Sequence, residues 1–152
     1  MIKLNVLAEK YLGVNYDGKI KIMDYYNVNC YPLVKRSRRY KIKPNDNWCA
    51  CFTSVVAHEA GLSVDQFPYE VSVGEQVKIA RERGAFTRNA EQAKEGDLII
   101  FNWNGDAWPD HVGIVKTINK GIVTSIEGNH NKTVGYRNLA LNSPFIVGFI
   151  KL

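Results

Sequence analysis

The chain has 152 residues, of which 45% are hydrophobic and 23% are charged, and these values suit one compact globular domain. No segment approaches the roughly 18 consecutive apolar residues that a membrane-spanning helix needs. The first residues, Met1 to Asn5, lack the charged region and apolar run of a secretory signal. We therefore expect a single domain over residues 1–152, made in a cytoplasm without a signal peptide and not inserted into a membrane.

The net charge of +5 is unevenly distributed along the chain. Residues 1–44 hold ten Lys or Arg and three acids, whereas the remainder holds ten basic and twelve acidic residues. The densest basic patch covers residues 35–43. Such a patch favours a polyanion, which can be nucleic acid, an anionic membrane or a wall rich in phosphate polymers. A solvated, solubilising face explains it equally well, so the patch does not by itself identify a function.

The three cysteines are Cys30, Cys49 and Cys51. An odd and small number of cysteines argues against a disulfide framework. A zinc site would need a second pair of ligands at suitable spacing, and the sequence has none. We therefore expect free thiols.

Three helices are predicted in the first part of the chain, each followed by a glycine that can end it. They cover residues 2–12, 49–60 and 74–83, and a turn-rich basic stretch up to Pro44 lies between the first two. An Asn/Asp cluster directly precedes the second helix and is typical of an N-cap. Cys49 is therefore expected in the first turn of a buried helix.

The remainder of the chain has the patterns of strands rather than helices. Strands are predicted over residues 97–101, 111–118, 122–127 and 145–150. Helices followed by antiparallel strands indicate an α+β fold.

The register of the hairpin around residues 119–121 depends on the length of its loop. A three-residue loop ending in Gly121 places Ile118 opposite Ile122 and His111 opposite Asn129, with Glu127 as a diagonal neighbour of His111. The other face then collects an apolar set, namely Val112, Ile114, Ile118, Ile122 and Ile126. A two-residue loop would instead place His130 opposite His111. We prefer the three-residue loop because it separates polar from apolar residues more cleanly.

These positions match the requirements of a thiol nucleophile. A thiol attacks an amide as a thiolate, which a helix N-terminus and a neighbouring imidazole both favour. A carboxylate or an amide must then hold the other ring nitrogen, and backbone N–H groups at the helix end can bind an oxyanion. Cys49, His111 and either Glu127 or Asn129 supply these parts in the order of the chain. We assign Glu127 as the partner of His111, because a carboxylate also stabilises the imidazolium, and Asn129 as a supporting group.

Four motifs resemble those of the CHAP family, the cysteine, histidine-dependent amidohydrolases/peptidases. Trp48-Cys49-Ala50-x-Phe52 resembles the nucleophile motif of the family and Asp110-His111-Val112-Gly113-Ile114-Val115 its histidine strand. The segment Gly96 to Phe101 is similar to the strand before that histidine, and Ile126-Glu127-Gly128-Asn129 to the third motif. The likeness extends to the opening segment and to a closing strand at residues 146–150, so it covers nearly the whole chain.

The resemblance implies a papain-like fold in which N-terminal helices pack on an antiparallel sheet. It also implies cleavage of bacterial peptidoglycan, either at the muramoyl–alanine amide or within stem or bridge peptides, as in phage endolysins, virion lysins and bacterial wall enzymes. We expect a monomer that acts at the cell wall, with residues 35–43 available to anionic wall polymers and no role in binding nucleic acid. The sequence departs from the family at Cys51, a second thiol, and in the long polar loop 102–110.

Some relatives bind calcium through an acidic loop before the cysteine, but residues 43–47 hold one carboxylate here. Because hard cations prefer several oxygen ligands and more charge, we predict no required metal or cofactor. Trp103 and Trp108, in the polar loop, are candidates for lining a substrate groove. Trp48 is a further candidate, although a core position beside the helix suits it equally well.

Two other functions fit the same residues. One is a different papain-like enzyme that processes amides, such as an amidase toxin or a transferase. The other is a non-enzymatic module that binds walls or nucleic acid through its basic segment, and for which Cys49 would be dispensable.

Overall fold

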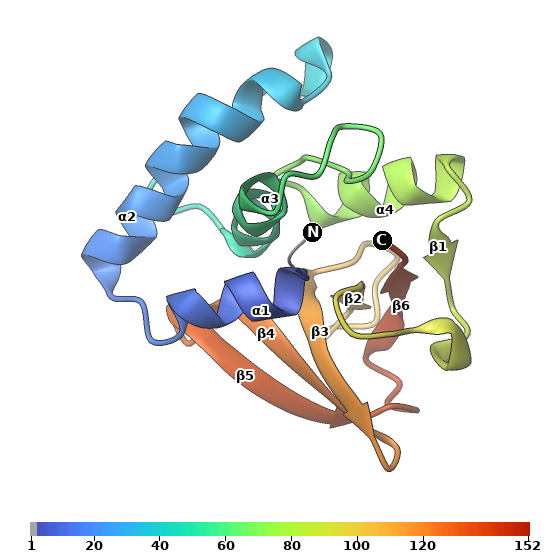
Figure 1. The fold of residues 1–152 in the computed structure, drawn as a ribbon. Helices are drawn as coiled ribbons and strands as arrows, with labels where there is room; N and C mark the ends of the chain where they lie inside the picture. Colours follow the sequence, from blue (N-terminus) through green and yellow to red (C-terminus); the bar gives the residue numbers. More distant parts are fainter. Residues whose placement is uncertain (1–2) are drawn as a thin grey trace.

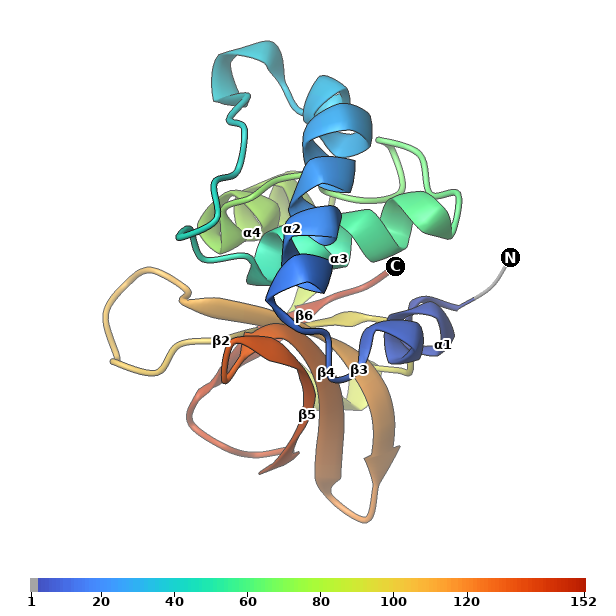
Figure 2. The ribbon, with the colours of Figure 1, turned by 90° about the vertical axis from the view of Figure 1, so that its left-hand side faces the viewer.

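The computed structural model describes residues 3–152 as a layer of helices packed on one antiparallel sheet (Figures 1 and 2). The helices are α1 (Leu4–Ala8), α2 (Tyr16–Tyr25), α3 (Cys49–Glu59) and α4 (Val73–Glu82). The strands are β1 (Phe86–Thr87), β2 (Leu98–Phe101), β3 (His111–Asn119), β4 (Ile122–His130), β5 (Thr133–Ala140) and β6 (Ile146–Ile150). They pair in the order β1-β6-β2-β3-β4-β5. The predicted α+β class with helices packed on an antiparallel sheet is confirmed.

The most buried helix, α3, lies on the sheet and is flanked by the other helices (Figure 2). All residues of α3 from Cys49 to Ala57 are buried, and they contact both β3 and β4. A helix that is apolar around most of its circumference is stable only when it is covered on every side. The sheet covers one side of α3, and α1, α2 and α4 contact it from the others.

The predicted helices at 49–60 and 74–83 are confirmed, but α2, β5 and the two-residue strand β1 were missed. Residues 14–44, expected to be turn-rich, contain α2 and its π-helical continuation Tyr26–Cys30. Strand β5 was not predicted at all. The first helix is also shorter than the predicted 2–12, since α1 ends at Ala8 and passes into a 3₁₀ turn at Glu9–Tyr11; its predicted start, Ile2, lies outside the described residues.

The hairpin between β3 and β4 has a two-residue loop, so the predicted three-residue loop is wrong. Asn119 pairs with Ile122, and both loop residues, Lys120 and Gly121, have positive φ. This is the backbone of a type I′ turn, whose twist matches that of the strands it joins. The register next shifts between Val115 and Thr117.

That β-bulge restores the predicted register beside the site. Ile114 pairs with Ile126, as the three-residue loop would have given, because the extra residue in β3 cancels the shorter loop. The bulge also reverses the faces beyond it. Ile118 packs with a second, smaller cluster of apolar residues on the face of the sheet away from α3, and Ile122 is 44% exposed. The prediction that both residues join Ile114 in the main core is therefore wrong.

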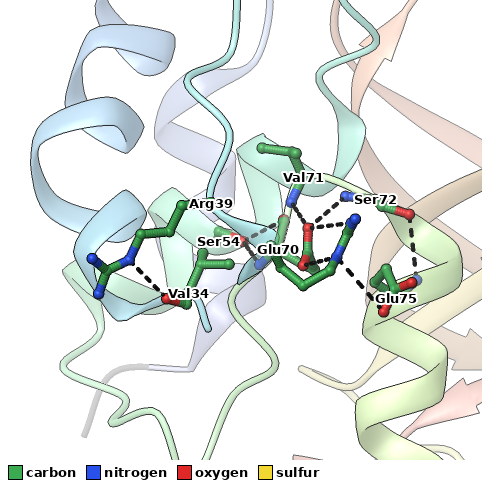
Figure 3. A network of polar contacts seen from close by, with 8 residues as sticks. Val34, Arg39, Ser54, Glu70, Val71, Ser72 and Glu75 are labelled. Carbon is green, nitrogen blue, oxygen red and sulfur yellow. Dashed lines mark hydrogen bonds and ion pairs between the residues drawn. The ribbon is translucent and has the colours of Figure 1, made fainter. Parts of the chain in front are cut away.

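Part of the basic segment is built into the fold. The Arg38 guanidinium forms an ion pair with buried Glu70 at 3.2 Å, and Glu70 also accepts hydrogen bonds from two backbone N–H groups. Figure 3 shows Glu70 with the backbone N–H groups of Val71 and Ser72, and Glu75 lies nearby. Arg39 donates to the carbonyl oxygens of Val34 and Pro32. The charges of these two arginines therefore stabilise the conformation of the loop. Fewer residues of the basic patch are then free to bind a polyanion.

Among residues 3–152, no helix has both the length and the apolar character needed to cross a membrane.

Candidate active site

Cys49 is the first residue of α3, as predicted. Its backbone N–H donates to Oδ1 of Asn47 at 3.3 Å, so the Asn47 side chain satisfies one of the free N–H groups of the helix end. The dipole of an eleven-residue helix points its positive end at this position. Such an end stabilises a negative sulfur.

His111 connects the thiol with a carboxylate. It begins β3, and its Nε2 atom lies 2.7 Å from Oε1 of Glu127 on β4. The side chain of Cys49 is near enough to raise the pKa of His111, and Nδ1 is the ring nitrogen that Glu127 leaves free. The structure thus brings Cys49, His111 and Glu127 together.

The register explains why Glu127 fits beside His111. Gly113 lies on the same face of β3 as His111, two residues away. A Cβ atom on Gly113 would lie 2.7 Å from Cγ of Glu127 and 3.2 Å from Cβ of Ser125. The absence of a side chain at Gly113 therefore makes the space that the Glu127 side chain occupies.

Electrostatics favours the charged form of both His111 and Glu127. Burial alone would lower the pKa of His111, but its hydrogen bonds to Cys49 and Glu127 outweigh this and raise the pKa to about 9. Burial would raise the pKa of Glu127, yet the hydrogen bond from His111 lowers it, with help from Ser125 and Arg137. The imidazolium form of His111 is therefore favoured beside the ionised Glu127 carboxylate at neutral pH.

The other two thiols lack such partners. Cys30, Cys49 and Cys51 are all at most 1% exposed, so exposure does not distinguish them. Burial raises the pKa of Cys30 to about 12 and that of Cys51 well above its ordinary value. Both are therefore neutral core residues that behave as small hydrophobes.

Asn129 lies close to the site but does not hold the histidine ring. Its Nδ2 atom donates at 3.1 Å to Oδ1 of Asn47, the same oxygen that accepts from the N–H of Cys49. Asn129 adopts a left-handed conformation with φ of 61° where the register of β4 shifts, and this turns its side chain toward the start of α3. Its position supports the nucleophile's helix end, whereas the ring hydrogen bond goes to Glu127.

The two other histidines lie elsewhere. His58, on α3, faces the hydroxyl of Tyr25, with Nδ1 to Oη at 2.7 Å. His130 pairs with Thr133 at the β4–β5 hairpin. Neither residue has the contact with Glu127 that His111 has.

The three tryptophans have different environments. Trp48 is 2% exposed and packs in the core, so the prediction that it lines a groove is wrong. Its side chain is enclosed because it directly precedes the fully buried start of α3. Trp103 stacks on Phe101 with ring centroids 4.8 Å apart and lies 6.3 Å from the ring of His111. Trp108 is 56% exposed.

Trp108 lines a groove of about 770 Å³ between α4 and the loop 102–109. Its indole lies on Gly74, where a Cβ atom would be 2.1 Å from the ring, and this contact fixes an otherwise exposed side chain. Three cationic side chains also line the groove, namely Lys78, Arg81 and Arg88. The lining extends to Pro109, two residues before His111 in the chain, but does not include Cys49, His111 or Glu127.

Sequence reasoning missed three residues that shape the site. Ser125 donates to Oε2 of Glu127 at 2.5 Å, and Arg137 donates to both of its carboxylate oxygens. Asn47 caps Cys49. Ser125 pairs with Arg137 across β4 and β5, so recognition of β5 from its alternating pattern would have placed Arg137 beside Glu127.

No cluster of three His, Cys, Asp or Glu side chains suited to a metal ion occurs within residues 3–152. The single carboxylate before the cysteine, Asp46, accepts from the Tyr40 hydroxyl and the Lys43 N–H.

Comparison with known proteins is consistent with this geometry. A search of curated proteins gives no match. Among solved structures, the chain is similar to a lipoprotein-like protein of the NLP/P60 family from Staphylococcus aureus subsp. aureus Mu50, with 22% identity, 86% of this chain and 39% of that chain covered, and a TM-score of 0.44. It is also similar to Ly7917, with 11% identity, 91% and 62% covered, and a TM-score of 0.45. The chain therefore spans only part of each of these solved chains.

The family model of the CHAP domain matches residues 21–129. This range includes Cys49, His111 and Glu127 and covers most of the described fold. The chain belongs to the CHAP domain family.

Proposed function

We propose that this domain hydrolyses an amide bond of bacterial peptidoglycan, with Cys49 as the nucleophile and His111 as the general base and acid. The observation that carries the proposal is the 2.7 Å contact between His111 and buried Glu127, together with the Cys49 side chain at the helix start, which raises the pKa of His111. The same three groups at the end of a helix are what nucleophilic attack on an unactivated amide requires.

The steps follow from these contacts. The Cys49 sulfur attacks the carbonyl carbon, and backbone N–H groups in the first turn of α3 stabilise the oxyanion. The C–N bond breaks as His111 transfers its proton to the leaving amine, which leaves a thioester on Cys49. His111 then takes a proton from water, and the resulting hydroxide attacks the thioester, which releases the carboxylate and regenerates the thiol.

Glu127 has two tasks in this scheme. Its hydrogen bond at Nε2 of His111 selects the tautomer whose Nδ1 faces Cys49. Its charge also stabilises the imidazolium that forms when the thiol ionises. Both tasks need a fixed carboxylate, and Glu127 is fully buried.

The substrate is proposed from the family and from the shape of the surface. The groove lined by Trp108 offers an aromatic face and cationic groups to a wall strand, which carries sugars and carboxylates. The exposed part of the basic segment, including Lys35, Arg36 and Lys41, is free to meet anionic wall polymers. We propose that the domain acts at the cell wall as a monomer without a metal or another cofactor.

The test compares two buried thiols two residues apart. Cys49→Ala should lower the rate of turbidity loss of purified cell walls by at least about 10³-fold. Cys51→Ala should retain most of the rate, because its sulfur faces roughly the opposite side of α3 at about 100° per residue. A folded Cys51→Ala protein without activity would overturn the assignment of the nucleophile, and undiminished wall binding with no turnover by the wild type would support a binding module instead.

A further inference from the structure

Arg137 on β5 is a charged partner of Glu127 to which the proposed catalytic scheme gives no role. Its Nε atom lies 3.0 Å from Oε1 and 2.9 Å from Oε2 of Glu127. The guanidinium lies over the indole of Trp103 at 4.6 Å and near the ring of Phe101 at 5.9 Å. Only 29% of the side chain is exposed, so it is held between two aromatic rings and a buried acid.

The contacts of Glu127 leave its carboxylate no free rotation. Oε1 accepts from His111 and Arg137, and Oε2 accepts from Ser125 and Arg137. A carboxylate with every oxygen engaged by donors on β3, β4 and β5 has one orientation. Loss of Arg137 would remove a contact from each oxygen at the same time.

The charge balance also depends on Arg137. Within residues 3–152, the titratable or charged groups in contact with His111 and Glu127 are Cys49 from α3 and Arg137 from β5. The neighbouring acid Asp110 is engaged by the N–H of Trp103. When His111 is neutral, Arg137 is therefore the cation that keeps a carboxylate ionised in a fully buried position.

We propose that Arg137, held against Trp103, is a positioning residue that keeps Glu127 ionised and aimed at His111, and thereby sets the reactivity of Cys49. This inference rests on the proposed site and goes beyond its three members. It differs from a merely structural ion pair because its loss should change the chemistry of the thiol and not only the stability of the fold.

The experiment measures alkylation of Cys49 by iodoacetamide as a function of pH, in a Cys51→Ala background and with modification located by mass spectrometry. Arg137→Ala should slow alkylation at pH 7 by about tenfold or more and move its half-maximum to higher pH, since one pKa unit corresponds to a tenfold change in the ionised fraction. Guanidinium chloride at low concentration should restore the rate to Arg137→Ala, whereas sodium chloride at equal ionic strength should not.

Matched variants separate this role from folding. Arg83→Ala removes an exposed arginine at the end of α4, outside the groove, and should leave the alkylation profile unchanged. Arg137→Lys keeps a charge but loses the planar contact with Trp103, and it should give an intermediate profile. If Arg137→Ala does not fold, as judged by circular dichroism, the same comparison is made between Arg137→Lys and the wild type.

Two outcomes distinguish this inference from the proposed function. An unchanged alkylation profile in folded Arg137 variants, with walls still lysed by the wild type, would overturn the role of Arg137 alone. A shifted profile that guanidinium restores, with no lysis of any wall by the wild type, would confirm the role of Arg137 and contradict the proposed substrate.

Discussion

Two buried glutamates in this fold each bind an arginine, and they differ in what else they touch. Glu70 accepts hydrogen bonds from Arg38 and from the backbone N–H groups of Val71 and Ser72. Glu127 accepts hydrogen bonds from Arg137 and Ser125, but also from the ring of His111. A buried carboxylate paired with arginine is thus not by itself a sign of catalysis.

The difference lies in the titratable neighbour. The donors of Glu70 are a guanidinium and two backbone N–H groups, none of which is a proton donor in ordinary acid–base chemistry. The Arg38–Glu70 ion pair therefore only holds the basic segment against the start of α4. The donor at Oε1 of Glu127 is an imidazole that faces a thiol on its other side. The Glu127 cluster can therefore pass a change of charge to Cys49, whereas the Glu70 cluster cannot.

The largest effect is expected at the group that distinguishes the two clusters. His111→Ala should lower wall lysis by several orders of magnitude, because both the base for Cys49 and the proton donor for the leaving amine are lost. His130→Ala, at the β4–β5 hairpin, is the control and should retain most activity. Lysis rates of purified walls that fall in His130→Ala but not in His111→Ala would show that the histidine is misassigned.

The next test makes the same substitution at each of the two glutamates. Glu127→Gln keeps the shape and removes the charge, and it should lower kcat by about 10²-fold or more. Glu70→Gln should leave kcat nearly unchanged but reduce the free energy of unfolding by roughly 1–3 kcal/mol, since buried hydrogen bonds are weakened. Thermal unfolding and wall lysis are measured on both variants. Equal loss of activity in both would remove the distinction drawn here.

The pH dependence should follow His111. Its folded-state pKa of about 9 lies above the ordinary value of 6.5, so the stabilising interaction is complete below pH 6.5 and disappears as pH rises through about 9. Wall lysis should fall over that range, and Glu127→Gln should move the fall to lower pH. The pKa of Glu127 is lowered, so its contribution is lost only in acid. A basic limb that does not move in Glu127→Gln would contradict the coupling.

The smallest effect is expected from the exposed part of the basic segment. Lys35→Glu, Arg36→Glu and Lys41→Glu together should weaken sedimentation with walls a few-fold at low salt and less at high salt, because exposed charges are screened. Arg38 and Arg39 are avoided, since their loss would disturb the contacts with Glu70 and Val34. Wall binding that is insensitive to both salt and these substitutions would exclude this role.

The positions of the proposed nucleophile and its proposed base were predicted from local patterns in the sequence. Placing Cys49 at a helix start and His111 at a strand start needed no tertiary information. The pairing of His111 with Glu127 was predicted from a loop length that is wrong. The prediction is nevertheless right beside the site, because a bulge at residues 115–117 that was not foreseen cancels the error in loop length. A bulge depends on packing of both strands, which the sequence of one hairpin does not reveal.

The remaining parts of the site depend on contacts between distant segments. Arg137 lies on a strand that was not predicted, and it meets Trp103 from a loop more than thirty residues earlier. Helix α2 and its π-helical continuation were missed although three of their buried residues, Ile22, Tyr26 and Cys30, repeat at helical spacing. Trp48 was misplaced because an aromatic residue beside a helix start suits both a groove and a core.

The most direct test of the central claim is mass spectrometry of the fragments released from purified peptidoglycan by the wild type and by Cys49→Ala. The account predicts one new amine and one new carboxyl group per cleavage, at a single kind of amide bond, and no fragments with Cys49→Ala. Fragments cut between sugars, or identical fragments from both proteins, would contradict cysteine-dependent amide hydrolysis by this domain.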